Sequence, residues 1–104
     1  MISRTWRGWT THENAGAYEA LLLTSILPGI RARLESGYHG AFLYRREIGN
    51  EVEFLTTMLF DSMEIVRQFA GDDYEVAVVP AAARELLVRF DSRSSHYEVL
   101  LSPE

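Results

Sequence analysis

The sequence predicts an α+β fold in which two helices cover one face of a four-stranded antiparallel sheet. Three observations lead to this class. A two-residue turn signal, Gly49-Asn50, separates two strand-like runs, and apolar residues recur every four positions from Tyr18 to Leu34, as they do on a helix. The other runs complete the order strand, helix, strand, strand, helix, strand, which is the βαββαβ order of a ferredoxin-like sheet.

The first strand and the first helix follow from residues 2–34. Ile2–Thr10 is rich in β-branched and aromatic residues, which favours a strand. Thr10 and Glu13 have the spacing of a capping box, so a helix is expected to begin near His12. Pro28 lacks a backbone donor and clashes with the preceding turn, so we expect a kink or a restart of this helix there.

The middle of the chain predicts a hairpin and a second helix. Gly40–Ile48 and Glu51–Phe60 are the expected strands, joined by the turn at Gly49-Asn50. Asp61 is expected to begin the helix, and Gly71 is expected to end it, because a residue in the left-handed conformation commonly follows the last turn.

The last third of the chain predicts a short helix and a strand. Asp72 and Asp73 are expected to cap a helical turn from Tyr74 rather than to hold a metal, because two adjacent acids without a third ligand make a poor cage. A further helix is expected from about Ala81 to Arg89, and a final strand from Ser95 to Leu101.

The hairpin strands are apolar on both sides. Phe42 and Tyr44 share one parity, and Ala41 and Leu43 share the other. A sheet with one covered face should alternate cleanly, so the second face is expected to meet another protein surface. The sequence therefore predicts a homodimer that packs sheet against sheet.

Composition excludes several classes of function. The 104 residues suit a single domain, 1–104, and 47% of them are hydrophobic, which is enough to fill a core. Without cysteine there is no disulfide and no thiolate, and all ten basic residues are Arg, so a lysine nucleophile is excluded. The net charge of -5 argues against nucleic acid as a partner. The three histidines lie far apart, so no zinc spacing is present and no metal is expected.

No apolar run is long enough to span a bilayer or to act as a secretory signal. A cytoplasmic protein without a membrane partner is therefore expected.

The chain resembles a known family. The run FDSMEIVRQFAGDDYEVAVVPAAARELLVRFDSRSSHYEV, from Phe60 to Val99, is similar to the C-terminal half of small proteins in the antibiotic biosynthesis monooxygenase superfamily. The matching pieces are Asp61-Ser62, Phe69-Ala70-Gly71, Ala77, Pro80, His96-Tyr97-Glu98-Val99, Trp6, Gly8 and the YRRE of Tyr44 to Glu47. The resemblance implies a dimeric α+β barrel, built from ferredoxin-like protomers with a cavity between sheet and helices in each.

Activities in that superfamily include cofactor-independent oxygenation of polycyclic aromatic phenols, haem degradation and quinol chemistry. This chain departs from the family at two places. Phe60 stands where relatives often have Trp, and Ser62–Ala70 has no histidine to ligate haem iron. The resemblance therefore implies chemistry that needs no cofactor.

Several residues are candidates for a site. His96 is the candidate catalytic residue, as a general base or an orienting group, with a hydrogen-bonded structural histidine as the alternative. Arg4 and Trp6 share a strand face, so they suit a phenolate or carboxylate ligand, although Arg4 would equally suit an ion pair with Glu98. The candidate ligand-binding residues are Arg4, Trp6, Tyr18, Phe42, Tyr44 and Phe60.

Two functions remain open on the sequence. The first is a cofactor-independent monooxygenase that acts on a small aromatic phenol or quinol in an apolar cavity, where the protein removes a proton and excludes water. The second is a non-catalytic dimeric barrel that binds a hydrophobic metabolite or serves as an accessory subunit.

Overall fold

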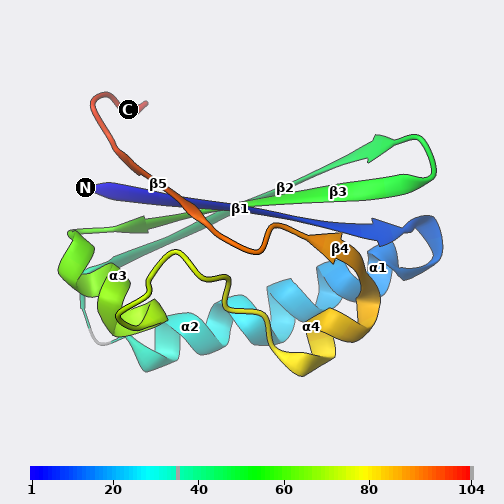
Figure 1. The fold of residues 1–104 in the computed structure, drawn as a ribbon, viewed down its shortest axis with the longest axis horizontal. Helices are drawn as coiled ribbons and strands as arrows, with labels where there is room; N and C mark the ends of the chain where they lie inside the picture. The colour runs from blue at the N-terminus through cyan, green and yellow to red at the C-terminus, as the bar shows by residue number, and fades with distance from the viewer. Residues whose placement is uncertain (35, 104) are drawn as a thin grey trace.

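A sheet lies over a layer of helices in the computed structural model, which describes residues 1–34 and 36–103 (Figure 1). The elements, in chain order, are β1 (Ile2–Thr11), α1 (His12–Leu21), the π-helical turn η1 (Leu22–Ile26), α2 (Leu27–Arg33), β2 (Tyr38–Ile48), β3 (Glu51–Phe60), α3 (Met63–Ala70), α4 (Ala81–Leu86), β4 (Leu87–Phe90) and β5 (Ser95–Glu98).

The sheet is antiparallel and has β1 at its centre. Its strand order is β2-β3-β1-β4, and β5 also pairs with β1. β5 lies beside Ile2–Thr5, whereas β4 lies beside Gly8–Thr10. The described residues thus form five strands rather than four, because the last edge of the sheet is divided between two short strands. The predicted ferredoxin-like α+β class, with the helices on one face, is confirmed.

The predicted helix from Ala81 to Arg89 is too long, since α4 ends at Leu86 and a strand begins at Leu87. Here β4 pairs with β1, where Arg89 lies opposite Trp9. The close approach depends on Gly8, at which a Cβ atom would lie 2.9 Å from the Leu87 side chain. Pairing with the central strand therefore outweighs the helical tendency of this run.

Other boundaries also differ from the prediction, among them that β2 begins at Tyr38 rather than Gly40. Thr11, not Thr10, caps α1, accepting from the Asn14 amide at 3.1 Å, and Ser62 rather than Asp61 caps α3. Shifts of one residue are common when neighbouring residues are both good caps. The last strand ends at Glu98, not at Leu101.

The predicted helical turn from Tyr74 is reduced to one hydrogen-bonded turn, in which the Val76 amide donates to the Asp73 carbonyl at 3.1 Å. The Asp73 carboxylate instead lies 2.9 Å from the Arg93 guanidinium, and the segment between α3 and α4 has only an isolated bridge, Val76 to Arg93. Gly71 ends α3 as predicted, with φ at 91°.

Pro28 accounts for the expected interruption of the first helix. Proline offers no N–H to the carbonyl four residues earlier, which is that of Thr24. The chain widens there into η1 and continues as α2 from Leu27. Such π turns are frequent at functional sites, and two η1 residues, Leu22 and Ile26, line the cavity described below.

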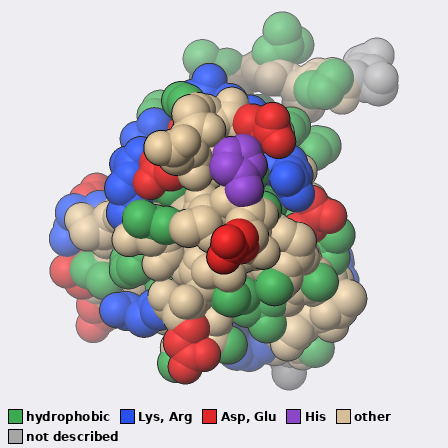
Figure 2. All heavy atoms as spheres, turned by 90° about the vertical axis from the view of Figure 1, so that its right-hand side faces the viewer, with side chains coloured by type: hydrophobic (Ala, Val, Ile, Leu, Met, Phe, Trp, Pro, Cys, Tyr) green, Lys and Arg blue, Asp and Glu red, His purple; other side chains and the backbone are tan. Residues whose placement is uncertain are grey.

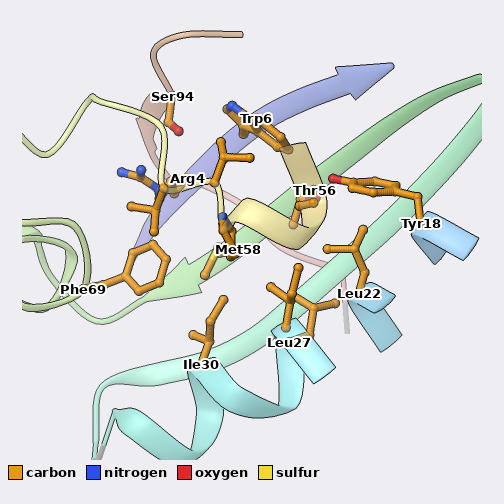
Figure 3. Close-up of a pocket in the computed structure, with 15 residues that line it drawn as sticks. Arg4, Trp6, Tyr18, Leu22, Leu27, Ile30, Thr56, Met58, Phe69 and Ser94 are labelled. Carbon is orange, nitrogen blue, oxygen red and sulfur yellow. The ribbon is translucent and has the colours of Figure 1, made fainter. Parts of the chain in front are cut away.

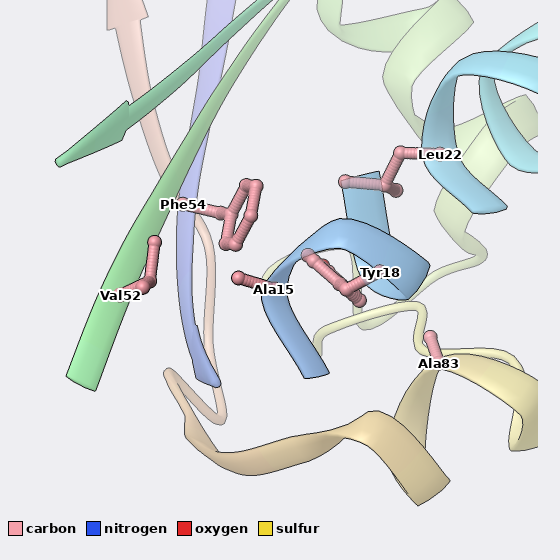
Figure 4. Packing of buried hydrophobic residues seen from close by; sticks show 6 residues of the cluster. All are labelled: Ala15, Tyr18, Leu22, Val52, Phe54 and Ala83. Carbon is pink, nitrogen blue, oxygen red and sulfur yellow. The ribbon is translucent and has the colours of Figure 1, made fainter. Parts of the chain in front are cut away.

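The core fills the space between sheet and helices. Towards the hairpin turn, Tyr18 of α1 meets Phe54 of β3 edge to face, with ring centroids 4.9 Å apart (Figure 4). Towards α3, Phe60 and Val66 are fully buried beside Tyr38. Even-numbered residues of β1 and β3 therefore face the helices.

The other face of the sheet carries Phe42 and Tyr44, whose rings stack with centroids 5.9 Å apart and are half exposed. Trp9 also lies on this face, but Arg89 and Arg7 cover its ring at 3.9 and 5.2 Å. The outer face of the sheet is thus apolar where Phe42 and Tyr44 of β2 lie, and positively charged where the two arginines cover Trp9.

Charged side chains of both signs share the molecular surface. The end view in Figure 2 shows Arg and acidic side chains interspersed. Pairs such as Arg89 with Glu51 at 3.0 Å and Arg45 with Glu19 at 3.1 Å reflect this mixing. Within residues 1–34 and 36–103, no helix has the length and apolar character needed to cross a membrane.

Candidate functional site

A cavity of about 60 Å³ lies between the sheet and the helices (Figure 3). Its wall includes residues of β1 and β3, of the continuous helical stretch from α1 through η1 to α2, and of the segment before α4. Arg4 and Phe69 lie at one end, and Tyr18 and Leu22 lie at the other. The lining residues are Arg4, Trp6, Tyr18, Leu22, Ile26, Leu27, Ile30, Thr56, Met58, Phe69, Val78, Val79, Pro80, Ala83 and Ser94.

Most of this wall is apolar, with a few polar groups. Hydroxyl groups come from Tyr18, Thr56 and Ser94, and the single charged lining residue among those described is Arg4. The indole N–H of Trp6 is already used, because it donates to the Asp91 carbonyl at 2.6 Å. Trp6 thus offers its ring, not its donor, to a ligand.

Arg4 is almost completely buried, with 3% of its surface exposed. Its Nη1 donates to the Tyr74 carbonyl and lies 2.9 Å from Nε2 of His96, while Nη2 donates to the Val76 carbonyl at 3.2 Å. The guanidinium also lies over the Phe69 ring, 5.4 Å from its centroid. Three of its five N–H groups therefore have protein acceptors, which leaves the Nε–H and one N–H of Nη2.

The charge of Arg4 has no acidic partner in the described part of the chain. All the ion pairs found there involve other cations. The alternative partner, Glu98, lies opposite Ile2 on β1, whereas Arg4 lies opposite His96. Burial lowers the pKa of Arg4 to about 10, so the group remains charged at neutral pH. An uncompensated cation thus borders one end of the cavity.

His96 lies behind Arg4 rather than in the cavity wall. Its ring packs edge to face against Tyr74, with centroids 5.2 Å apart. Its Nδ1 is buried and has no hydrogen-bond partner among the described residues. Burial, and then the charge of Arg4, lower the pKa of His96, while Glu75 opposes the shift.

The structure brings Arg4, Trp6 and Tyr18 together and separates the other candidate ligand-binding residues from them. Phe60 is fully buried against Tyr38 and Phe69 and does not reach the cavity, because the space beside it is filled by core side chains. Phe42 and Tyr44 point from the outer face of the sheet, since β2 presents their parity away from the helices.

Tyr18 is a neutral phenol in this environment. It is 1% exposed, and burial raises its pKa to about 12. Its hydroxyl is therefore suited to hydrogen bonding rather than to accepting a proton at neutral pH.

Sequence reasoning missed Thr56, Ser94 and Val78–Pro80. The parity of β3 could have found Thr56, because it lies between Phe54 and Met58 on the buried side and opposite Trp6. Val78–Pro80 gave no such signal, since they belong to an irregular segment whose path depends on distant contacts.

That segment, Gly71–Pro80, closes one side of the cavity and is held by a few bonds. The Ala77 amide donates to the Ser92 carbonyl at 3.0 Å, and the Ser94 amide donates to the Glu75 carbonyl at 2.6 Å. Arg4 and Arg93 supply the polar contacts described above, and Nε of Arg84 donates to the Val79 carbonyl at 3.1 Å.

Metal binding has no support from the side-chain arrangement. In the described ranges, no three His, Asp or Glu side chains come close enough together to hold an ion.

Comparison with solved structures supports the family resemblance at the level of the fold. Rv0793 from Mycobacterium tuberculosis matches with a TM-score of 0.63 and 19% identity, over 99% of this chain and 98% of that one. A Bacillus cereus protein proposed to be an antibiotic biosynthesis monooxygenase matches with a TM-score of 0.65 and 11% identity, over 100% of this chain and 95% of that one. Neither family models nor curated proteins gave a match.

Proposed function

We propose that this chain binds a small phenol or quinol as its anion in the cavity and, with dioxygen, oxygenates it without a cofactor. The observation that carries the proposal is the buried guanidinium of Arg4, which borders an apolar cavity and has no acidic partner in the described chain. A nearby cation lowers the pKa of a bound phenol, because it favours the charged form. The fold shared with the Bacillus cereus protein supports this reading.

The chemistry needs only the ligand and dioxygen. For a phenol with hydrogen on the reacting carbon, one oxygen atom enters the ring as a carbonyl and the other leaves in water. The phenol loses two hydrogens and supplies all four electrons that reduce dioxygen. The protein would hold the phenolate, the electron-rich form, and keep water from the reacting carbon.

Ligand entry requires the cavity to enlarge. Its volume of about 60 Å³ is well below the roughly 150 Å³ of an engineered cavity that holds benzene. Gly71–Pro80 is the segment suited to move, because it supplies Val78, Val79 and Pro80 to the wall and has only one isolated bridge.

Anion binding is tested with 4-nitrophenol, whose anion absorbs visible light and whose neutral form does not. Near the pKa of the free probe, addition of the protein should increase the anion absorbance, because Arg4 favours the ionised form. Arg4→Met should weaken binding at least tenfold, since hydrogen bonds to a charged group contribute about 1.5–3 kcal/mol.

The matched control for this experiment is Arg45→Met, which removes an exposed cation paired with Glu19. It should bind the probe as the unchanged chain does. An absorbance that stays constant or falls when the unchanged protein is added would show that the site does not prefer an anion. That reading comes from the unchanged protein, so it holds even if Arg4→Met is unstable.

Oxygenation is tested by oxygen uptake with 1-naphthol or a naphthalene hydroquinone. The expected result is uptake of one dioxygen per naphthol consumed, with no added metal or flavin, and a rate at least tenfold lower in Arg4→Met because less of the substrate is ionised. Heat-denatured protein corrects for spontaneous oxidation.

A second function is favoured by a specific observation. In the described chain, no free acid–base group lines the cavity, because His96 lies behind Arg4 and Tyr18 is neutral. This arrangement suits a non-catalytic protein that binds an apolar anion. Binding of 4-nitrophenol without oxygen uptake for any of the phenols would establish that function instead.

Movement of the Gly71–Pro80 segment is tested with a disulfide. Val76 and Arg93 are bridge partners, and directly opposite strand residues have Cα atoms about 4.5–5.5 Å apart, within disulfide range. The chain has no other cysteine. Oxidised Val76→Cys/Arg93→Cys should bind 4-nitrophenol at least tenfold more slowly than the same protein after reduction, by stopped-flow absorbance. Equal rates in both states, with Arg93→Ala as the control for the lost ion pairs, would contradict the movement.

We also propose that two protomers pack through the outer face of the sheet. Phe42 and Tyr44 expose about half of their surface there, next to the partly buried Leu55 and Leu59. Sedimentation at micromolar concentration should give a dimer, and Phe42→Asp/Tyr44→Asp should give a monomer with an unchanged far-UV spectrum, because charge opposes burial of this face. A monomer for the unchanged chain would refute the dimer.

A further inference from the structure

The relation between His96 and Arg4 assigns His96 a definite protonation state. The two residues are cross-strand partners of β5 and β1, and His96 Nε2 lies 2.9 Å from Arg4 Nη1. A guanidinium only donates hydrogen bonds. Nε2 must therefore be the acceptor, so the imidazole is neutral and carries its proton on Nδ1.

The surroundings of His96 agree with a neutral ring. The groups that face it are Arg4 from β1 and, from the segment between α3 and α4, the ring of Tyr74 and the more distant charge of Glu75. Burial and Arg4 both lower the pKa of His96, and only Glu75 acts in the opposite direction. The two larger influences, burial and the charge of Arg4, therefore oppose a second proton on the ring at neutral pH.

This arrangement is incompatible with a general base. A base needs a free lone pair within hydrogen-bond reach of the proton that it removes. The lone pair of Nε2 is occupied by Arg4, the other nitrogen carries the proton, and the ring is not part of the cavity wall.

We infer that His96 is a positioning residue. It holds the Arg4 guanidinium in place for the anionic ligand and takes no proton from the ligand. This inference rests on the proposed function. His96 and the carbonyls of Tyr74 and Val76 accept three N–H groups of Arg4. Because the guanidinium is planar and rigid, these contacts also fix the direction of its two remaining N–H groups, the Nε–H and one of Nη2. Loss of the imidazole acceptor frees Arg4 to change its side-chain conformation.

The test compares His96→Gln with His96→Leu. The Gln side chain has an oxygen that can accept from Arg4, but it cannot act as a base near neutral pH, whereas Leu has no acceptor. The dissociation constant for 4-nitrophenol in His96→Gln should lie within about threefold of the value for the unchanged chain. In His96→Leu it should be at least tenfold higher. Where the unchanged chain takes up oxygen, His96→Gln should retain that activity. Ser95→Ala is the matched control, because Ser95 is exposed and points to the opposite face.

Each outcome decides the inference. If both variants bind the probe as the unchanged chain does, or both bind it equally weakly, His96 does not position Arg4. If both variants still bind the probe but neither takes up oxygen, His96 acts as a base. If the unchanged chain does not favour the probe anion, the proposed function fails before these variants are compared.

A second measurement does not depend on the stability of the variants. Nitrogen-15 NMR of the unchanged protein at neutral pH should show the His96 proton on Nδ1. A proton on Nε2 would overturn the inference, because that nitrogen could not then accept from Arg4.

Discussion

The buried charge of Arg4 is the constraint on which the cavity end of the molecule depends. An unpaired charge inside a protein is very costly unless it is well hydrogen-bonded, and no described carboxylate compensates this one. Two backbone carbonyls, an imidazole nitrogen and the face of the Phe69 ring supply the partial negative charge instead. To provide the carbonyls, the chain from Tyr74 to Val76 must run beside β1. An irregular segment thereby acquires a defined path along the cavity.

The fold was predictable where local chemistry decides it. The hairpin depends on Gly49-Asn50, and its strands were predicted to within two residues at each end. The start of α1 at His12 and the end of α3 before Gly71 likewise depend on nearby caps. Prediction failed at Leu87, where the run LLVRF is compatible with a helix or a strand and pairing with β1 decides. A partner about 80 residues away in the sequence leaves no local signal there.

The site was predictable only in part, for a related reason. Parity alone places Arg4 and Trp6 on one face of β1, and both line the cavity. Parity cannot identify the partner of Arg4 on β5, because His96 and Glu98 differ by two residues and point to the same side. Only the register, with His96 opposite Arg4 and Glu98 opposite Ile2, decides between them. Parity also places Phe42 and Tyr44 on one side of β2 and Ala41 and Leu43 on the other, but it does not say which of the two sides faces the helices.

The described cavity wall has no free base, but the proposed oxygenation does not require one. A base is needed when the ligand arrives protonated and must lose its proton inside the site. A cation that stabilises the phenolate shifts the ionisation equilibrium itself, so the ligand can bind as the anion or release its proton to water while the cavity is open. The proposed oxygenation then depends on two properties. The first is a positive charge in a fixed position, which Arg4 supplies and its three acceptors hold in place. The second is closure of the cavity after the ligand binds. In this proposal, His96 contributes to the first as an acceptor, and the Gly71–Pro80 segment contributes to the second. The proposal therefore assigns charge stabilisation and water exclusion to the cavity, rather than proton transfer by the protein.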